Sequence, residues 1–433
     1  MTNINKIKKN ILNREIRIGV IGLGYVGLPI IVQLINRGYK VVGFDIDKEK
    51  NKKLNKGESY IKHISKEKIL SLLENDFLAT SDWSKINSLD IIIICVPTPL
   101  SNNNEPDLSF LENTLNCISD YFNYNQLLIL ESTSFPGTTR EIVLPFIEKK
   151  GFKIGNNFFL SYSPEREDPG NKEFPAEIIP KIISGITDEC LGIVKTFYDE
   201  VFKSTVSVSS TDTAEMTKLL ENIYRAVNIG LVNEMKIISK KMGINIHEVI
   251  GAASTKPFGY NPFQPGPGIG GHCIPVDPFY LTWKAKKIGI ETHFIEAAGL
   301  INAKMPVWVV NQLKSNLFLK DIGINNSSIL VIGIAYKKNL DDIRESPALK
   351  IIELLLDQGA KVSYHDPFIK KLVKTRKYNF NLESVDLKKL NNFDCVIIIT
   401  DHDSIDYSII ENESKLIFDT RGRLKNNSNV IQI

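Results

Sequence analysis

A glycine pattern near the start of the chain narrowly limits how this region can fold. Gly22, Gly24 and Gly27 lie where the β-branched run IRIGVIG gives way to GLPIIVQLINRG, which has the apolar spacing of a helix. Glycines in the order G-x-G-x-x-G at such a junction permit a tight turn, a close approach to a pyrophosphate and close helix–strand packing. The pattern predicts a dinucleotide site, and a tight turn without a ligand is the alternative.

The next strand supports the dinucleotide interpretation. The run KVVGFD ends at Asp45, about 20 residues beyond the glycines. A carboxylate at this position accepts hydrogen bonds from ribose hydroxyls and repels a 2′-phosphate. We therefore expect NAD, rather than NADP, as the cofactor.

Strand and helix patterns alternate over the first two hundred residues and again after about residue 320. Between them, residues 212–243 have three- and four-residue apolar spacing without an internal proline, which predicts one long amphipathic helix. The later run SSILVIGIAYK resembles IRIGVIGLGYVG. The sequence predicts an α/β protein with two Rossmann-like, doubly wound domains joined by a long central helix and a helical connector.

Three domains are expected from this pattern. We predict an NAD-binding domain over residues 1–205, a central helical domain carrying a cysteine loop over residues 206–318, and a second Rossmann-like domain over residues 319–433.

Composition excludes several classes of function. A net charge of +3 without basic runs argues against nucleic acid, and the apolar runs are shorter than the ~20 residues that span a membrane. Five cysteines without a CxxC pair, and a start that lacks the apolar core of a signal peptide, indicate free thiols in the cytoplasm. No His, Cys and carboxylate spacing is typical of a metal site.

One cysteine lies in a loop of unusual stiffness. The stretch PGPGIGGHCIPVDP holds Cys273, with Asp277 four residues later. Its prolines lack amide donors and its glycines disfavour regular structure, so it is neither a helix nor a central strand. Pairing of Cys273 with His272 is disfavoured, because neighbours in sequence usually point apart. Asp277 could also simply begin a turn.

Other polar residues lie where ligands bind in α/β proteins. Glu131, Ser132 and Thr133 end one predicted strand and Glu165 follows another. Lys218 and Asn222, four residues apart, share a face of the long helix. A solvated pair of Lys218 with a neighbouring glutamate, and a surface amide for Asn222, are the simpler alternatives.

The motifs together resemble one family. GLGYVGLP, CVPTP, EST followed by PGTTRE, SPERE, AEMTKLLENIYRAVNIGLVNE, PGPGIGGHCIPVDP and GIAYKKNLDDIRESP occur in that order. The chain, from about Ile16 to its end, resembles the UDP-sugar 6-dehydrogenases. The resemblance implies a four-electron oxidation of a sugar alcohol to a carboxylate with two NAD. Cys273 would form a thiohemiacetal with the intermediate aldehyde and then a thioester, which water hydrolyses.

The resemblance also implies further catalytic roles. Lys218 and Asn222 would stabilise oxyanion charge, and Asp277 would orient Lys218 or a water. Thr133 would hold the water that acts as a base, and Glu165 would be the general base for hydrolysis. The chain departs from the family pattern after Glu165, so the second hydrolytic acid is open; the candidates are Glu167 and Asp168, while Arg166 could face the substrate.

Binding residues follow from the same resemblance. The NAD contacts would come from the fingerprint and from scattered positions: Gly22, Gly24, Tyr25, Val26, Gly27, Asp45, Thr98, Ser132 and Arg344. The UDP-sugar contacts would be Arg166, Phe258, Gly259, Tyr260, Gly271, Lys337 and Arg421. For Lys337 and Arg344, surface charges beside Asp341 and Asp342 are the alternative.

The motifs SPEREDPGN and KPFGYNPFQPGPGIGGHCIP resemble the N-acetylhexosamine branch. We expect UDP-N-acetylglucosamine as substrate, with UDP-N-acetylgalactosamine or UDP-glucose as rivals, and a product used for capsule, O-antigen or another surface glycan. A two-electron dehydrogenase and a non-catalytic sensor are the other classes. The long helix would form a homodimer, with Lys256 near the place of a residue that reaches across the interface in relatives.

Overall fold

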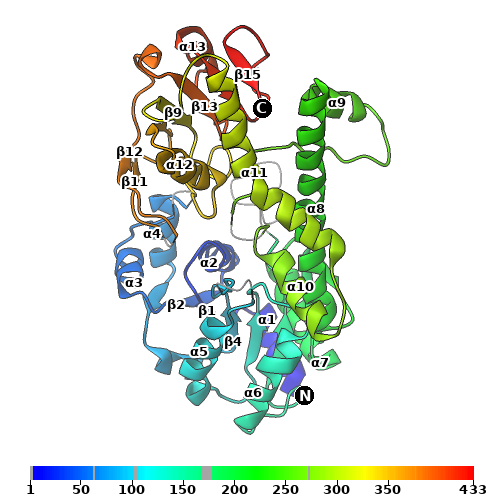
Figure 1. Ribbon diagram of the computed structural model, residues 1–433. Coiled ribbons are helices and arrows are strands. Elements are labelled where there is room, and N and C mark those ends of the chain that lie inside the picture. Colours follow the sequence, from blue (N-terminus) through cyan, green and yellow to red (C-terminus); the bar gives the residue numbers. More distant parts are fainter. Residues whose placement is uncertain (1–2, 62–63, 102–104, 167–177, 272–273, 376) are drawn as a thin grey trace. The chain divides into compact units, whose positions relative to one another are not determined.

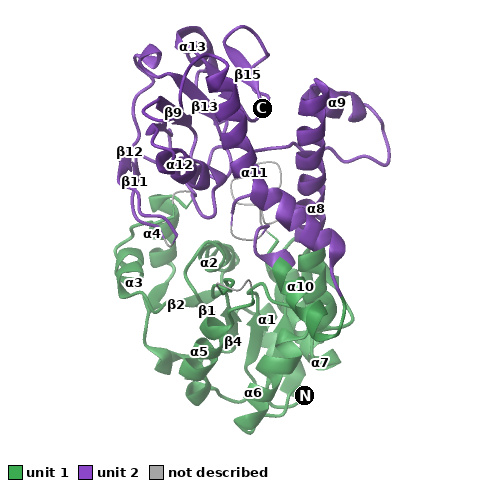
Figure 2. Cartoon of the chain, in the orientation of Figure 1, with its two compact units in different colours: residues 1–221, 279–290 green, residues 222–278, 291–433 purple. Residues whose placement is uncertain are grey.

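The computed structural model describes residues 3–61, 64–101, 105–166, 178–271, 274–375 and 377–433 (Figure 1). The chain divides into two compact units (Figure 2). The first comprises residues 1–221 and 279–290, and the second residues 222–278 and 291–433. Each unit is described by itself below.

The first unit is built on an eight-stranded sheet with the order β3-β2-β1-β4-β5-β6-β7-β8. All neighbours are parallel except β6 and β7, which are antiparallel, so the expected parallel sheet is interrupted once. Strand β1 lies between β2 and β4, and the chain therefore reverses its direction of winding there, where open α/β sheets bind ligands. The strands are β1 (Arg17–Ile21), β2 (Lys40–Phe44), β3 (Leu78–Thr80), β4 (Ile91–Ile94), β5 (Leu127–Leu130), β6 (Phe159–Tyr162), β7 (Lys181–Gly185) and β8 (Thr205–Ser207).

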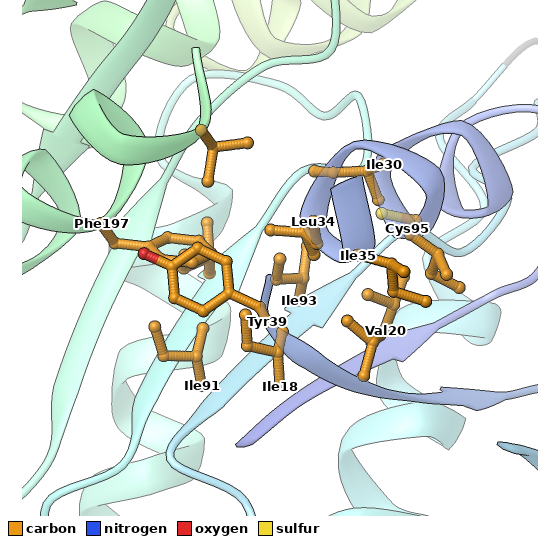
Figure 3. Packing of buried hydrophobic residues seen from close by; sticks show 14 of the residues in the cluster. Ile18, Val20, Ile30, Leu34, Ile35, Tyr39, Ile91, Ile93, Cys95 and Phe197 are labelled. Carbon is orange, nitrogen blue, oxygen red and sulfur yellow. The ribbon is translucent and has the colours of Figure 1, made fainter. Parts of the chain in front are cut away.

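Helices cover both faces of this sheet. On one face, Leu34 and Phe197 pack with Ile18 and Ile91, and the ring of Phe197 lies edge-on to Tyr39 with centroids 5.7 Å apart (Figure 3). The central strands are apolar on both faces, as expected for a covered parallel sheet. The helices are α1 (Asn3–Leu12), α2 (Gly27–Asn36), α3 (Lys48–Asn55), α4 (Lys66–Glu74), α5 (Ser109–Ile118), α6 (Leu144–Lys149), α7 (Asp188–Val201) and α10 (Asp277–Lys287), with short turns η1 (Trp83–Ser88), η2 (Ser119–Tyr121) and η3 (Thr139–Val143).

The long helix predicted from apolar spacing is present as α8 (Thr211–Met242), which has 32 residues and is about 48 Å long. The shorter α9 (Ile246–Ala253) follows it. Helix α11 (His293–Phe318) corresponds to the second predicted helical stretch and continues through Pro306.

The second unit contains a smaller sheet that repeats the winding of the first. Its order is β10-β9-β13-β14-β15 and all neighbours are parallel, with β9 between β10 and β13. A separate antiparallel pair, β11 with β12, lies outside this sheet. The elements are β9 (Ser328–Ile332), α12 (Pro347–Asp357), β10 (Lys361–His365), β11 (Lys371–Leu372), β12 (Leu382–Glu383), η5 (Leu390–Asn392), β13 (Cys395–Ile398), α13 (Tyr407–Glu413), β14 (Ile417–Asp419) and β15 (Val430–Gln432).

The predicted fold class, two Rossmann-like α/β sheets linked through a long helix, is confirmed. The predicted domain boundaries stay a prediction. Among the described residues, no helix is long and apolar enough to cross a membrane.

Candidate active site

The three glycines between β1 and α2 serve different purposes. Gly22 has a φ of +96°, and a Cβ there would lie 2.5 Å from the carbonyl oxygen of Cys95. A Cβ on Gly27 would lie 1.9 Å from the carbonyl oxygen of Gly22. A Cβ on Gly24, in contrast, would meet no atom within 4 Å. The fold therefore requires Gly22 and Gly27, whereas the open space at Gly24 suits a group from outside the protein, as a pyrophosphate cradle requires.

Asp45 ties this turn to β2. Its carboxylate accepts hydrogen bonds from the backbone amides of Leu23, at 3.0 Å, and Asp47, at 2.9 Å. The hydroxyl of Tyr60 donates to the carbonyl oxygen of Leu23, and burial, helped by the Asp45 charge, raises the pKa of Tyr60. These contacts fix the carboxylate at the end of β2, and its lone pairs are not exhausted by two amides. The cradle and the carboxylate both fit NAD.

Four other predicted cofactor residues belong to the first unit. Tyr25 and Val26 lie close to this turn in sequence, and Thr98 and Ser132 follow β4 and β5. Tyr25 and Val26 are half-buried just before α2. Ser132, directly after β5, donates through its hydroxyl to the carbonyl oxygen of Val96 at 2.9 Å, which links the ends of the two strands. Thr98 is buried, and its carbonyl oxygen accepts a 2.7 Å hydrogen bond from the Tyr280 hydroxyl. Thr133 is half-buried next to Ser132.

A buried charge cluster lies at the end of β5 and the start of β7. The ammonium of Lys181 lies 2.9 Å from a carboxylate oxygen of Glu131 and 3.6 Å from one of Glu165. Tyr198 donates to the other oxygen of Glu131. Burial opposes the charge of Lys181, but the two carboxylates outweigh it and raise the pKa of this lysine. Burial raises the pKa of Glu131, and the nearby ammonium opposes that shift.

Glu165 also contacts the central helix. Lys218 of α8 is buried and donates to the backbone carbonyl oxygen of Glu165. A cavity of about 10 Å³, roughly the volume that one water needs, lies beside Glu165, Arg166 and Lys181. The surface pair suggested as the simpler alternative for Lys218 is not what the structure shows.

The two glutamates that could have formed that pair have other partners. Glu215 is fully buried and accepts hydrogen bonds from the amides of Gly137, at 2.6 Å, and Thr139, at 2.9 Å. Burial raises the pKa of Glu215 to about 7, although these donors oppose the shift. Glu221 lies 2.6 Å from the guanidinium of Arg166, which also donates to the carbonyl oxygen of Pro180 at 2.7 Å.

Within the second unit, Asn222 and Asp277 form a buried pair. The side-chain amide of Asn222 donates to the Asp277 carboxylate at 2.5 Å. Asp277 begins helix α10, so the pair holds the start of this helix to α8. Asn222 is therefore no surface amide, and Asp277 does more than begin a turn.

Cys273 itself, with His272, Glu167 and Asp168, lies outside the described residues. The loop that leads to Cys273 is described and is firmly held. The amide of Gly266 donates to the side-chain oxygen of Asn233 in α8 at 2.9 Å, and Asn233 donates in turn to Asn302 in α11 at 2.9 Å. The amide of Gly271, at a φ of +91°, donates to the carbonyl oxygen of Arg344 at 2.9 Å.

This loop passes so close to Tyr336 and Arg421 that side chains would not fit. A Cβ on Gly270 would lie 2.6 Å from the Cβ of Tyr336, and one on Gly266 would lie 2.6 Å from Nη1 of Arg421. The structure thus places Arg421 against Gly266, five residues before Gly271 in the same loop.

The remaining predicted binding residues differ in their settings. Arg421 donates through Nε to the carbonyl oxygen of Ile399 at 2.7 Å, and burial lowers its pKa. Arg344 forms a bidentate pair with the buried Asp342, with the shortest contact 2.7 Å, and its role in cofactor binding stays a prediction. Lys337 is half-buried.

The predicted substrate segment Phe258, Gly259 and Tyr260 is largely exposed. Phe258 is 71% exposed, and the ammonium of Lys256 lies 5.0 Å from its ring centroid. A role of this segment in substrate binding stays a prediction.

Sequence reasoning missed Lys181, Tyr198, Asn233 and Asn302. The one available signal was Lys181, a charged residue at the start of the apolar run KIISG. A lysine at the edge of a buried strand needs a counter-charge, and Glu131 after β5 was the candidate.

Sequence models of one family match most of the chain. The NAD binding domain of the UDP-glucose/GDP-mannose dehydrogenase family matches residues 16–202, its central domain residues 212–304 and its UDP binding domain residues 330–426. The chain belongs to the UDP-glucose/GDP-mannose dehydrogenase family.

Individual relatives cover nearly the full length. Protein CapL of Staphylococcus aureus is 35% identical over 418 residues, covering 95% of this chain and 96% of CapL. The UDP-N-acetyl-D-glucosamine 6-dehydrogenase of Pseudomonas aeruginosa is 33% identical, covering 93% of this chain and 94% of that protein. The solved structure of the UDP-D-ManNAc dehydrogenase from Pyrococcus horikoshii matches with a TM-score of 0.85 at 32% identity, covering 95% of this chain and 96% of that one.

The family membership confirms three predictions made from the sequence. The protein is an NAD-dependent UDP-sugar dehydrogenase, NAD is its cofactor, and the C-terminal sheet belongs to a UDP binding domain. The roles of individual residues, the sugar and the number of electrons are proposals, taken up below.

Two glycine substitutions should separate folding from cofactor binding. Gly27→Ala is expected to lower the free energy of unfolding by about 1–3 kcal/mol, because its Cβ would overlap the Gly22 carbonyl oxygen. Gly24→Ala is expected to change it by less than about 0.5 kcal/mol, yet to weaken NADH binding at least about tenfold. Urea denaturation and NADH fluorescence titration measure the two effects. Equal losses of stability would contradict the division of roles.

Lys181→Met should be strongly destabilising, because it leaves Glu131 buried beside no cation. We expect a loss of about 3–5 kcal/mol in urea denaturation. The matched control is Lys195→Met on α7, whose exposed pair with Asp199 spans 2.6 Å and should contribute less than about 1 kcal/mol. The double variant Lys181→Met with Glu131→Leu should recover much of the loss. Similar effects of Lys181→Met and Lys195→Met would contradict a structural role for the cluster.

Proposed function

We propose that this enzyme oxidises the C6 alcohol of a UDP-N-acetylhexosamine, with UDP-N-acetylglucosamine favoured, to the uronate, using two NAD per turnover and Cys273 as nucleophile. The product would supply a surface polysaccharide such as capsule or O-antigen. The observation that carries the proposal is the setting of two neighbouring polar residues of α8. Lys218 and Asn222 are both buried, and their partners are Glu165 and Asp277, the residues that the family resemblance assigns to the same reaction.

The chemistry proceeds in three steps. In the first, the C6 hydroxyl gives its proton to a base and the C6 carbon gives a hydride to the oxidant, which leaves an aldehyde. The Cys273 thiolate adds to the aldehyde carbon, and the resulting thiohemiacetal loses a second hydride and a proton to become a thioester. Water attacks the thioester, the carboxylate forms and the thiolate leaves. NAD, when bound, accepts the hydride in each oxidation.

The protein residues supply proton transfer and charge stabilisation. Thr133 would hold the water that takes the hydroxyl proton. The Lys218 ammonium and the Asn222 amide would stabilise the negative charge that develops on the C6 oxygen, because fixed donors in a water-poor site need no reorganisation. Glu165 would accept the proton of the attacking water, and the water-sized cavity beside it supports that assignment.

The names of similar proteins suggest which sugars are candidate substrates. One similar protein is a UDP-N-acetyl-D-glucosamine 6-dehydrogenase, at 33% identity, and another is a UDP-D-ManNAc dehydrogenase, at 32% identity. UDP-N-acetylmannosamine is therefore the second candidate substrate, beside the galacto epimer considered from the sequence. All three share the uridine diphosphate and the acetamido group.

We also propose a homodimer paired through α8. The exposed face of this helix carries a long apolar stripe: Met216, Leu220, Tyr224, Leu231, Met235, Ile238 and Met242. These residues recur mainly at intervals of three, four or seven, so they lie on one side of the helix. A stripe of this length, with Leu220 63% exposed, is unusual for a face in contact with water only.

A substrate panel tests the reaction. UDP-N-acetylglucosamine, its galacto and manno epimers and UDP-glucose are compared by NADH release, with the amount of NADH per sugar measured at completion. We expect two NADH per UDP-N-acetylglucosamine. One NADH per sugar, ending at an aldehyde, would instead support a two-electron dehydrogenase, and a higher rate with the manno epimer would move the assignment to that sugar.

Cys273→Ser should abolish acid formation, by at least about 10³-fold in kcat, because the nucleophile is lost. The variant Cys117→Ser, which alters an exposed free cysteine, is the control and should keep full activity. Acid formation by Cys273→Ser at the unaltered rate would exclude the thioester route. Complete absence of turnover by the unaltered protein on every sugar would support the sensor alternative.

Leu231→Glu should convert the dimer to monomers at micromolar concentration, because it places a charge in the middle of the apolar stripe. Leu70→Glu on α4, which alters another exposed leucine, should leave the dimer intact. Light scattering after gel filtration gives the mass of each. A monomeric unaltered protein, or a dimeric Leu231→Glu variant, would contradict pairing through α8.

A further inference from the structure

The second unit contains a pocket of about 250 Å³ that the proposed reaction does not use. Its wall comes from the end of α8, the start of α9 and the C-terminal segment, and it includes Lys236, Lys240, Asn245, His247 and Gln432. None of these residues was predicted to bind substrate or cofactor. The lining residues include two lysines and a histidine but no acidic side chain.

Lys236 is the most unusual member of this wall. It is only 3% exposed, and its ammonium donates to the carbonyl oxygen of Thr420 at 2.8 Å. In the part of the chain that the structure describes, it forms no ion pair within 4.0 Å of a carboxylate. Burial, and then the neighbouring charge of Arg421, lower the pKa of Lys236 to about 7. The charge of Asp419 opposes this shift, and the ammonium lies 5.9 Å from the ring centroid of Trp308. Its one hydrogen bond to a neutral acceptor leaves two donors, which is unfavourable for a buried ammonium.

A second cation lies one turn further along the helix. The ammonium of Lys240 donates to the carbonyl oxygen of Gln432 at 2.5 Å, and burial lowers its pKa. Asn245, which also lines the pocket, caps α9 by accepting the amide of His247 at 3.0 Å. The positive end of the α9 dipole therefore adds to the charge of the two lysines.

We propose that this pocket is a binding site for phosphate, either inorganic phosphate or the phosphoryl group of a small phosphate monoester. A phosphate dianion compensates both ammonium groups, whereas a single carboxylate compensates one. Each ammonium has donors beyond its carbonyl contact, and charge-assisted hydrogen bonds to phosphate are among the strong ones. The volume exceeds that of a phosphoryl group and leaves room for a small organic part.

The pocket is independent of the face proposed for helix pairing. At about 100° per residue, Lys236 and Lys240 lie roughly 140° and 180° around α8 from Leu231, the middle of the exposed apolar stripe. The site thus faces the second unit's own sheet and C-terminal segment.

Isothermal titration of the full-length protein with inorganic phosphate tests the proposal. Saturating UDP and NAD are present throughout, so that the phosphate sites of substrate and cofactor are filled. The unaltered protein should show one saturable site. Lys236→Met and Lys240→Met should each weaken phosphate binding at least tenfold. Lys241→Met, an exposed lysine of the same helix that does not line the pocket, should bind phosphate like the unaltered protein.

Three results would overturn the proposal: no saturable phosphate binding by the unaltered protein, unaltered binding by both pocket variants, or a loss in Lys241→Met equal to theirs. Acetate at the same ionic strength is the second probe. Binding of acetate as tight as that of phosphate would overturn the choice of a dianion. If Lys236→Met does not fold, as judged by circular dichroism, the half-buried Lys240→Met decides.

Discussion

The structure depends on buried polar side chains along one face of α8. Glu215 accepts the amides of Gly137 and Thr139, Asn222 donates to Asp277, and Asn233 accepts the amide of Gly266. Each of these side chains satisfies a loop or a helix start that would otherwise be buried with unpaired groups, which is costly. At about 100° per residue, Glu215, Asn222 and Asn233 lie within about 20° of one another. The helix thus turns its strongest polar groups inward and leaves an apolar stripe outside.

In both sheets a glycine with positive φ follows the central strand, and this shared local requirement explains why so much of the fold could be predicted. Gly22 follows β1 and Gly333 follows β9, both with positive φ, and a Cβ on either would strike the backbone beyond the neighbouring strand, at Cys95 or Thr400. The requirement is local, so it appears in the sequence as a strand ending in glycine. The apolar spacing of α8 is local as well, and its predicted extent agrees with the structure.

What could not be predicted depends on contacts between distant segments. Periodicity identified α8 as amphipathic, and its apolar surface suggested pairing of two chains. It did not show that Leu220 and Leu231 belong to the exposed face, because the polar face finds its partners more than 30 residues away. The antiparallel β6–β7 pair also depends on contacts between distant segments, and so does the position of Lys181 beside Glu131. The apolar run after Lys181 indicates that this lysine needs a counter-charge, but it does not fix which carboxylate supplies it.

The cluster around Lys181 divides two carboxylates by their surroundings. Glu131 is fully buried, lies 2.9 Å from the ammonium and also accepts the Tyr198 hydroxyl, so its oxygens are committed. Glu165 lies 3.6 Å from the same ammonium, and its side chain is 20% exposed. One lysine therefore balances a carboxylate that is held in place and another that keeps access to water. This difference favours Glu165 over Glu131 for the base of the proposed hydrolysis, because a base that exchanges protons with water needs access to water.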